Sequence, residues 1–132
     1  MDQDIQHLQL LSIFHYVLGG MIGLFGCFPI FHLAVGIAIV TGALDVPEEP
    51  PAPAYFGWLF VGMAVVVMSF MWTLASAVII AGRKLASRTG YMYCLVVAGV
   101  ECIFMPLGTV LGVFTILVLV RPSVKQLFGV PE

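Results

Sequence analysis

The sequence predicts an all-α integral membrane protein of four helices, of which the last two form a short helical hairpin that turns near Pro106. Three observations support this fold class. Hydrophobic residues occupy 61% of the 132 positions and charged residues only 9%, whereas a soluble domain of this size needs far more charge to cover its surface. The apolar residues gather in runs long enough to cross a bilayer. The basic residues lie between these runs and not within them.

The composition also excludes several classes of function. A formal net charge of -2 provides no basic field that would attract nucleic acid. The chain contains no phosphate-binding glycine loop, no HExxH motif and no spacing typical of zinc ligands. Its cysteines, Cys27, Cys94 and Cys102, lie inside apolar runs, where cysteine behaves as a small hydrophobic residue. We therefore expect a single transmembrane domain over residues 1–132, without a metal site or a disulfide framework.

The first helix is predicted over residues 8–44, a run without Asp, Glu, Lys or Arg. About 37 residues of helix are longer than one perpendicular crossing requires. The helix therefore either tilts, with its first turns among the lipid headgroups, or folds back near residues 26–29. The single helix is favoured because no polar turn-forming cluster interrupts the run. Pro29 predicts a kink in both cases.

Small residues on this helix predict a packing face. Gly19, Gly23 and Gly26 recur at spacings of four and three residues, so they lie on one side of a helix. A face without side chains lets the backbone of a neighbouring helix approach closely. His15 falls on the same face.

The middle of the chain divides clearly into a loop, a helix and a second loop. Residues 45–54 hold four prolines and three acids, which predict an extramembrane acidic loop. Residues 55–82 carry no charge and predict the second helix, with Tyr55 and Trp58 at its membrane interface. A basic loop over residues 83–90 follows.

The stretch from residue 91 to residue 120 holds a single charge, Glu101. As one straight helix it would run about 45 Å, beyond a hydrocarbon core of roughly 30 Å. Pro106 removes a backbone donor and Gly108 permits a reversal. We therefore predict two short helices, over residues 91–105 and 107–120. Gly108 and Gly112 give the second of them a small-residue face for close packing.

The charge distribution predicts the topology. All five Lys and Arg residues lie within 83–88 and 121–125, and the positive-inside rule assigns both segments to the cytoplasm. The stretch between them must then cross an even number of times, in agreement with a hairpin. The acidic loop is expected on the opposite side, and the N-terminus and the C-terminal tail, 121–132, on the cytoplasmic side.

Glu101 is the main candidate for an intramembrane polar site. An ionised and unpaired carboxylate within a membrane segment costs at least about 3 kcal/mol, so this residue is expected to be protonated, paired, hydrated or close to the turn. His32 is the predicted partner, because it reaches a similar depth. Such a pair would form a proton or cation site. The alternative is a neutral Glu101 that bonds a carbonyl freed by Pro106, or that holds protomers together.

Histidine also suggests a cofactor alternative. His15 and His32 are candidates for axial ligands of haem or another pigment, because neutral imidazole binds such metals well. They lie on different faces of an unkinked helix and so would not clamp one cofactor within a single chain. Apart from this alternative we expect no cofactor.

Two parts of the chain resemble a known group of proteins. Residues 7–20, HLQLLSIFHYVLGG, are similar to the N-terminal signature of small multi-pass bacterial membrane proteins without an assigned activity. Residues 106–115, PLGTVLGVFT, with 121–128, RPSVKQLF, are similar to their C-terminal signature. The resemblance implies a bacterial cytoplasmic (inner) membrane and transfers no catalytic residue.

The expected function is non-enzymatic. We expect a homo-oligomeric scaffold or an accessory subunit of a larger membrane complex, in contact with the lipid bilayer and without a nucleic-acid partner. The alternative is a small ion or proton channel, or a permease, with Glu101 in its path. An enzyme is not expected, because no nucleophile, base and orienting group converge in the sequence.

Overall fold

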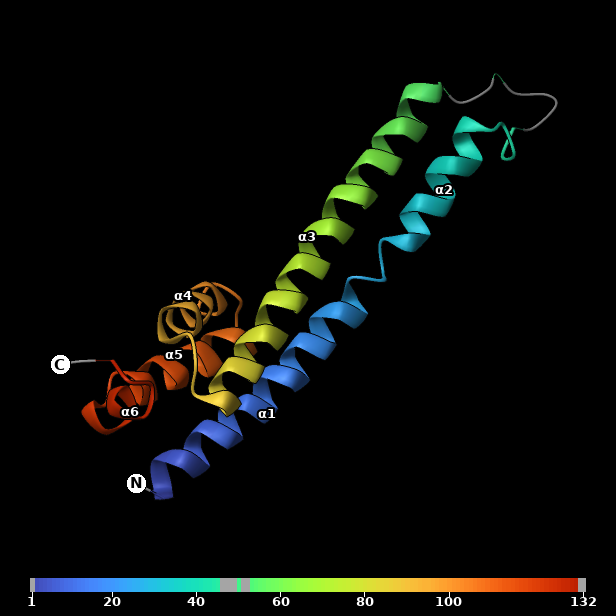
Figure 1. The fold of residues 1–132 in the computed structure, drawn as a ribbon. Coiled ribbons are helices and arrows are strands. Elements are labelled where there is room, and N and C mark those ends of the chain that lie inside the picture. The colour runs from blue at the N-terminus through green and yellow to red at the C-terminus, as the bar shows by residue number, and fades with distance from the viewer. Residues whose placement is uncertain (1, 46–49, 51–52, 131–132) are drawn as a thin grey trace. The chain divides into compact units, whose positions relative to one another are not determined.

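The computed structural model describes residues 2–45, 50 and 53–130, and all regular secondary structure within them is helical. The helices are α1 (Asp2–Phe25), α2 (Ile30–Val40), α3 (Ala54–Ser87), α4 (Tyr91–Glu101), α5 (Leu107–Leu119) and the six-residue α6 (Pro122–Leu127), as Figure 1 shows. The all-helical fold class is confirmed, but the described residues form five longer helices where four were predicted. Two helical stretches, Gln3–Val40 and Ala54–Ser87, are long and apolar enough to cross a membrane.

The extra helix arises at residues 26–29, where the predicted helix 8–44 is divided into α1 and α2. Proline lacks an amide hydrogen and its ring clashes with the carbonyl four residues earlier. The backbone therefore changes to bonds between residues three apart, from Cys27 N to Leu24 O and from Phe28 N to Phe25 O. The prediction also misplaced the ends, because it followed only apolar residues. Polar side chains such as Gln3 and Asp4 extend α1 to Asp2, and α2 ends at Val40.

The predicted basic loop 83–90 is wrong over most of its length. Helix α3 continues to Ser87, because arginine and lysine are good helix formers whose long stems carry the charge away from the helix surface. The helix stops where Arg88 and Gly90 adopt positive φ angles of 56° and 66°. Of the predicted acidic loop 45–54, residues 46–49 and 51–52 lie outside the described residues.

The chain divides into two compact units, where the sequence was interpreted as one domain. Unit 1 comprises Met1–Met21 with Leu74–Glu132, and unit 2 comprises Ile22–Thr73. Helices α1 and α3 contribute to both units.

The hairpin of α4 and α5 forms much of unit 1. A Cβ atom added at Gly108 would lie 2.6 Å from the carbonyl oxygen of Glu101, and one added at Gly112 would meet the carbonyl oxygen of Ala98. The contacts pair later residues of α5 with earlier residues of α4, so the two helices are antiparallel. Helix α4 ends at Glu101, four residues before the predicted end, and α5 begins directly after Pro106.

The core of unit 1 combines side chains from α1, α3 and the C-terminal helices. Its buried members are Leu8, Leu11, Leu85, Cys94, Leu111, Val118, Leu119 and Val124. The first two turns of α1 therefore lie beside the last turns of α3 and of α5. Within the predicted tail, α6 joins this core through Val124.

Unit 2 is held by a contact between two glycines that the sequence analysis did not select. A Cβ atom added at Gly36 of α2 would lie 2.9 Å from the carbonyl oxygen of Gly57 in α3, and one added at Gly57 would lie 2.9 Å from that of Gly36. Gly26 meets α3 further along, with a Cβ position 3.0 Å from Trp72 Cδ1. Because positions 26 and 36 meet α3 in succession, the chain does not fold back on itself at residues 26–29.

Replacing Gly36 by valine is expected to destabilise unit 2. The new side chain would overlap Val61 and the Gly57 carbonyl, and overpacking of this kind typically costs about 1–3 kcal/mol. Gly62→Val is the matched control, since a Cβ atom at Gly62 meets nothing within 4 Å. Thermal unfolding in detergent, followed by circular dichroism, measures both variants. Equal melting temperatures for the two would contradict the Gly36–Gly57 contact.

Candidate functional site

The candidate site begins with a close approach between α1 and α3 in unit 1. The hydroxyl of Ser12 donates a hydrogen bond of 2.7 Å to the carbonyl oxygen of Gly82. A Cβ atom at Gly82 would lie only 3.1 Å from His15 Cβ. One turn further along, Gly19 leaves room for Ile79, whose Cγ1 would be 2.6 Å from an added Cβ atom. Small residues thus bring the imidazole of His15 against the backbone of α3.

His15 and Glu101 form a buried pair. His15 Nε2 lies 3.3 Å from Glu101 Oε2, and the two side chains are 0% and 2% exposed. Glu101 is the last residue of α4, and its carbonyl oxygen lies under Gly108 of α5. The pair therefore connects α1 to the α4–α5 hairpin inside unit 1.

The contact made by the second ring nitrogen of His15 indicates where the protons of the pair lie. Nδ1 lies 2.8 Å from the carbonyl oxygen of Leu11. A carbonyl oxygen only accepts hydrogen bonds, so Nδ1 carries a proton. In a neutral pair, one further proton is then shared between Nε2 and Oε2, either as imidazole with a carboxylic acid or as imidazolium with a carboxylate. Adding or removing a proton would leave a net charge in the interior, which is costly.

The pair is close but imperfectly aligned. The separation of 3.3 Å is within the distance of an ion pair, yet its angles are not those of a hydrogen bond. Among the described residues, neither carboxylate oxygen of Glu101 has a hydrogen-bond partner. The buried hydroxyl of Thr115 on α5 donates within its own helix, to the carbonyl oxygen of Leu111 at 2.7 Å. Glu101 thus depends on His15 for its polar contact.

The structure corrects the predicted partner of Glu101, which was His32. His32 belongs to unit 2, where its ring stacks on Phe60 at 6.2 Å and lies 6.1 Å from the ring of Phe28. The prediction placed His32 at the same depth in the membrane as Glu101 by assuming one unbroken helix from Leu8. In the structure, α1 begins at Asp2 and ends at Phe25, before His32. The signal for His15 was its place on the same face as Gly19.

The predicted packing glycines differ in their contacts. Gly19, Gly108 and Gly112 make close contacts between helices of unit 1. Gly23 is half-buried, and its carbonyl oxygen accepts a weak bond of 3.6 Å from Cys27 Sγ.

As for metal ligands, the described part of the chain contains no group of three or more His, Cys, Asp or Glu that could hold an ion. Both ring nitrogens of His15 face protein atoms.

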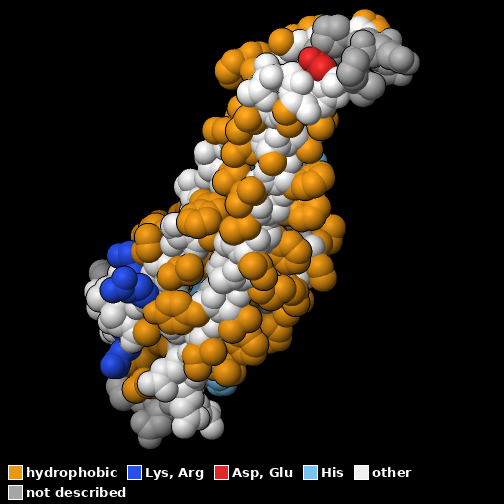
Figure 2. Space-filling model, turned by 90° about the vertical axis from the view of Figure 1, so that its right-hand side faces the viewer, with side chains coloured by type: hydrophobic (Ala, Val, Ile, Leu, Met, Phe, Trp, Pro, Cys, Tyr) orange, Lys and Arg blue, Asp and Glu red, His pale blue; other side chains and the backbone are white. Residues whose placement is uncertain are grey.

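The basic residues gather at one end of unit 1, as Figure 2 shows in blue. Arg121 Nη1 lies 3.3 Å from Asp4 Oδ1, which joins the first turn of α1 to the residue before α6. Lys84 Nζ lies 5.5 Å from the centre of the Tyr93 ring. Because Leu8 and Leu85 share one core, the start of α1, the end of α3 and the start of α6 meet at this end.

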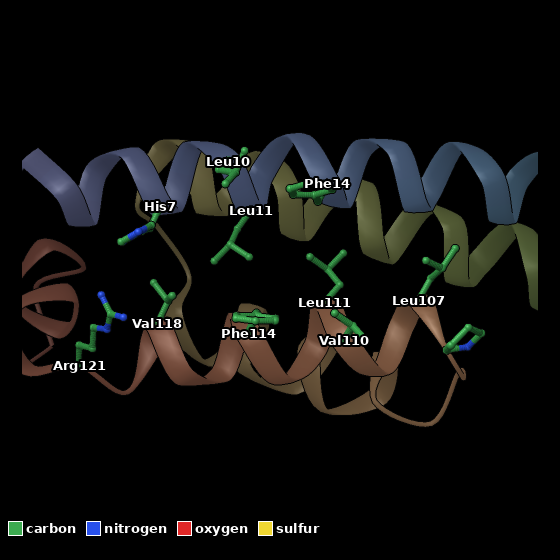
Figure 3. Close-up of a pocket in the computed structure, with 11 residues that line it drawn as sticks. His7, Leu10, Leu11, Phe14, Leu107, Val110, Leu111, Phe114, Val118 and Arg121 are labelled. Carbon is green, nitrogen blue, oxygen red and sulfur yellow. The ribbon is translucent and has the colours of Figure 1, made fainter.

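A groove of about 560 Å³ lies between α1 and α5 in the same unit. Its walls are apolar, with Phe14 opposite Phe114 and with Leu11 and Leu111 between the helices (Figure 3). His7 and Arg121 stand together at one end of it. The sequence analysis did not predict this groove, since its walls come from segments about a hundred residues apart.

A scan of protein-family models, a search of curated proteins and a search of solved structures each found no match to this chain.

The His15–Glu101 pair is expected to couple the two residues energetically. Glu101→Leu should cost about 1–3 kcal/mol, because it leaves His15 Nε2 buried without a polar partner. The double variant His15→Leu with Glu101→Leu should cost less than the sum of the single changes, with a coupling of about 0.5–3 kcal/mol. Glu101→Gln should stay close to wild type, since its amide donates to Nε2.

Thermal unfolding in detergent measures this cycle. Val100→Leu, at a position of α4 that is 39% exposed, controls for a change in the same helix. Strict additivity of the two leucine substitutions would show that the pair does not hold α1 against α4.

Proposed function

We propose that this chain is a small multi-pass membrane protein with a structural role, as a homo-oligomeric scaffold or as an accessory subunit of a larger membrane complex. The observation that carries the proposal is the contrast between its surface and its interior. Large apolar side chains cover the outside of its helices, as Figure 2 shows in orange, while the buried side chains of His15 and Glu101 pair inside unit 1. That arrangement suits an apolar surrounding.

The exposed apolar residues are large and numerous. They include Leu24, Phe25, Phe28, Phe31, Trp58, Val66 and Ile103, each at least 63% exposed. Lipid chains or partner helices would cover them, since contiguous apolar surface of this extent is rare on soluble monomers.

The position of the charges supports the proposed topology. The Arg121–Asp4 contact and the shared core of Leu8 and Leu85 bring the N-terminal turn and both basic segments to one end of unit 1. The positive-inside rule assigns such an end to the cytoplasm. Both termini would then be cytoplasmic, and the bacterial cytoplasmic membrane is the proposed location.

The α4–α5 hairpin fits a re-entrant segment that starts from this basic end. Its helices, of 11 and 13 residues, span about 16 and 20 Å, short of a core of roughly 30 Å. A turn inside hydrocarbon must satisfy its own backbone. Here Phe104 N donates to Glu101 O at 2.9 Å and Thr109 Oγ1 donates to Cys102 O at 2.8 Å, while Ile103 and Met105 are exposed.

The structural role of Glu101 follows from these contacts. Its carboxyl group and His15 are each other's polar contact in the interior, and in the proposed role they hold the end of α4 against α1. At 0% and 1% exposure, the two residues are out of reach of a substrate. We therefore favour a lock between helices over a catalytic site.

A second candidate function is a proton channel or permease with Glu101 in the path. One observation favours it: both oxygens of Glu101 lack a hydrogen-bond donor of good geometry among the described residues. Within this second proposal, Glu101 would accept and release the transported proton.

The assembly state tests the leading proposal. The membrane fraction that contains the protein is extracted with mild detergent and its mass is measured by native mass spectrometry, with an absorption spectrum of the same sample. We expect a discrete multimer, or a stable complex with another membrane subunit, without visible absorbance. A colourless monomer that keeps its fold and retains no partner in lipid contradicts the proposal. A bound chromophore would revive the haem alternative.

The variant Glu101→Gln separates the two functions. A structural lock predicts unchanged assembly and no proton flux in vesicles reconstituted with either protein. A proton site predicts flux with the wild type and its loss in Glu101→Gln, with the same assembly. His32→Gln serves as the control, because His32 contacts aromatic rings and not Glu101. Flux that is indistinguishable between wild type and Glu101→Gln would exclude the channel.

A further inference from the structure

We infer that the groove between α1 and α5 binds one acyl chain of an anionic phospholipid, whose phosphate meets Arg121. This inference rests on the proposed membrane location. It concerns a ligand of the protein, which the structural role does not require.

The shape of the groove favours a chain-like apolar ligand. Leu11, Leu111 and Val118 are at most 9% exposed and form its floor, whereas Phe14 and Phe114, at 51% and 59%, stand as its rims. In Figure 3 the two phenyl groups extend from opposite helices and are offset along the groove. A ligand lying there would contact carbon atoms along nearly all of its length.

The groove is long enough to cover one leaflet of a bilayer. From Leu107 to Arg121 the α5 wall rises about 21 Å, and half of a hydrocarbon core is roughly 15 Å. With Arg121 at the basic end, an acyl chain that enters at the interface would end close to Leu107, near the hairpin turn.

The volume argues against a helix as the occupant. A helix about 10 Å wide and 21 Å long fills roughly 1,600 Å³, nearly three times the 560 Å³ of the groove. The groove lies in the range of pockets for small ligands, about 300–1,000 Å³. A helix would rest on the rims and leave the floor uncovered.

The charge at the open end favours an anionic headgroup. The Arg121 side chain is 47% exposed, and only its Nη1 is used by Asp4, so other guanidinium donors remain for a phosphate. His7, exposed at the same end, adds a ring that can donate. All five basic residues of the chain lie in the segments that meet there, which makes this end net positive and attracts anionic lipid.

The test measures lipid retention by native mass spectrometry. The protein is reconstituted in vesicles with equal amounts of phosphatidylglycerol and phosphatidylethanolamine and is then extracted in mild detergent. We expect one retained phosphatidylglycerol per chain. Val110→Trp should fill the groove and lower retention about tenfold, a change of 1.4 kcal/mol in binding. Val113→Trp is the matched control on the same helix, outside the groove.

A second pair of variants tests the headgroup without filling the groove. Arg121→Gln should keep a retained lipid but lose the preference for phosphatidylglycerol, whereas Lys125→Gln, which removes the same charge outside the groove, should keep it. Equal preference in these two variants would show that only the general charge of this end matters and would overturn the phosphate site.

The outcomes separate this inference from the proposed function. If alkaline carbonate strips the wild-type protein from the vesicles, the membrane role itself is wrong. If the protein stays inserted and the two tryptophan variants retain lipid equally, only the lipid site is wrong. If Val110→Trp instead releases a second copy of the chain, the groove is a protein interface and the lipid assignment is overturned.

Discussion

The contact between His15 and Glu101 is the constraint on which unit 1 depends. Each side chain would be costly if charged and alone in an apolar interior, and each is the polar contact of the other at 3.3 Å. This requirement ties the end of α4 to α1. It also explains why small residues surround the pair: Gly82 lets His15 lie against α3, and Gly108 lets α5 cross the last turn of α4.

Small residues set the helix spacing in both units, but they act differently in each. In unit 2, Gly36 and Gly57 face one another, and the backbones meet directly. In unit 1, Gly82 and Gly19 receive side chains of the opposite helix. Both units thus depend on close backbone approach, which in unit 1 includes Gly108 and Gly112 of the hairpin. Unit 1 adds a polar pair within a core of leucine and valine. The interior of unit 1 also contains two ionisable side chains, those of His15 and Glu101.

The basic residues distinguish one end of unit 1 from the other. Cations, the N-terminal turn and both ends of the α4–α5 hairpin meet at one end of unit 1, while the hairpin turn carries the exposed apolar residues Ile103 and Met105. The same geometry places a basic residue, Arg121, at the mouth of an apolar groove. Membrane orientation and lipid recognition would therefore share one set of residues, because both depend on cations at the boundary between apolar and polar surroundings.

The sequence by itself determined the properties that follow from local chemistry. Pro29 and Pro106 interrupt helices because they lack an amide hydrogen. The turn at Pro106 was predicted, whereas only a kink within one continuous helix was predicted at Pro29. Glu101 was recognised as a residue that needs a partner because it is the single acid in its apolar run. The face bearing Gly19 and His15 was visible in the spacing, and it does pack inward.

Only the tertiary structure decided which faces meet. The partner of Glu101 is His15 and not His32, since His15 lies in the part of α1 that belongs to unit 1, whereas His32 lies in α2 of unit 2. The sequence also did not predict the roles of Gly36, Gly57 and Gly82, or the groove between α1 and α5. These features depend on which helix faces meet. Helical periodicity defines the faces of each helix, but their register is set by interlocking side chains from segments far apart in the chain.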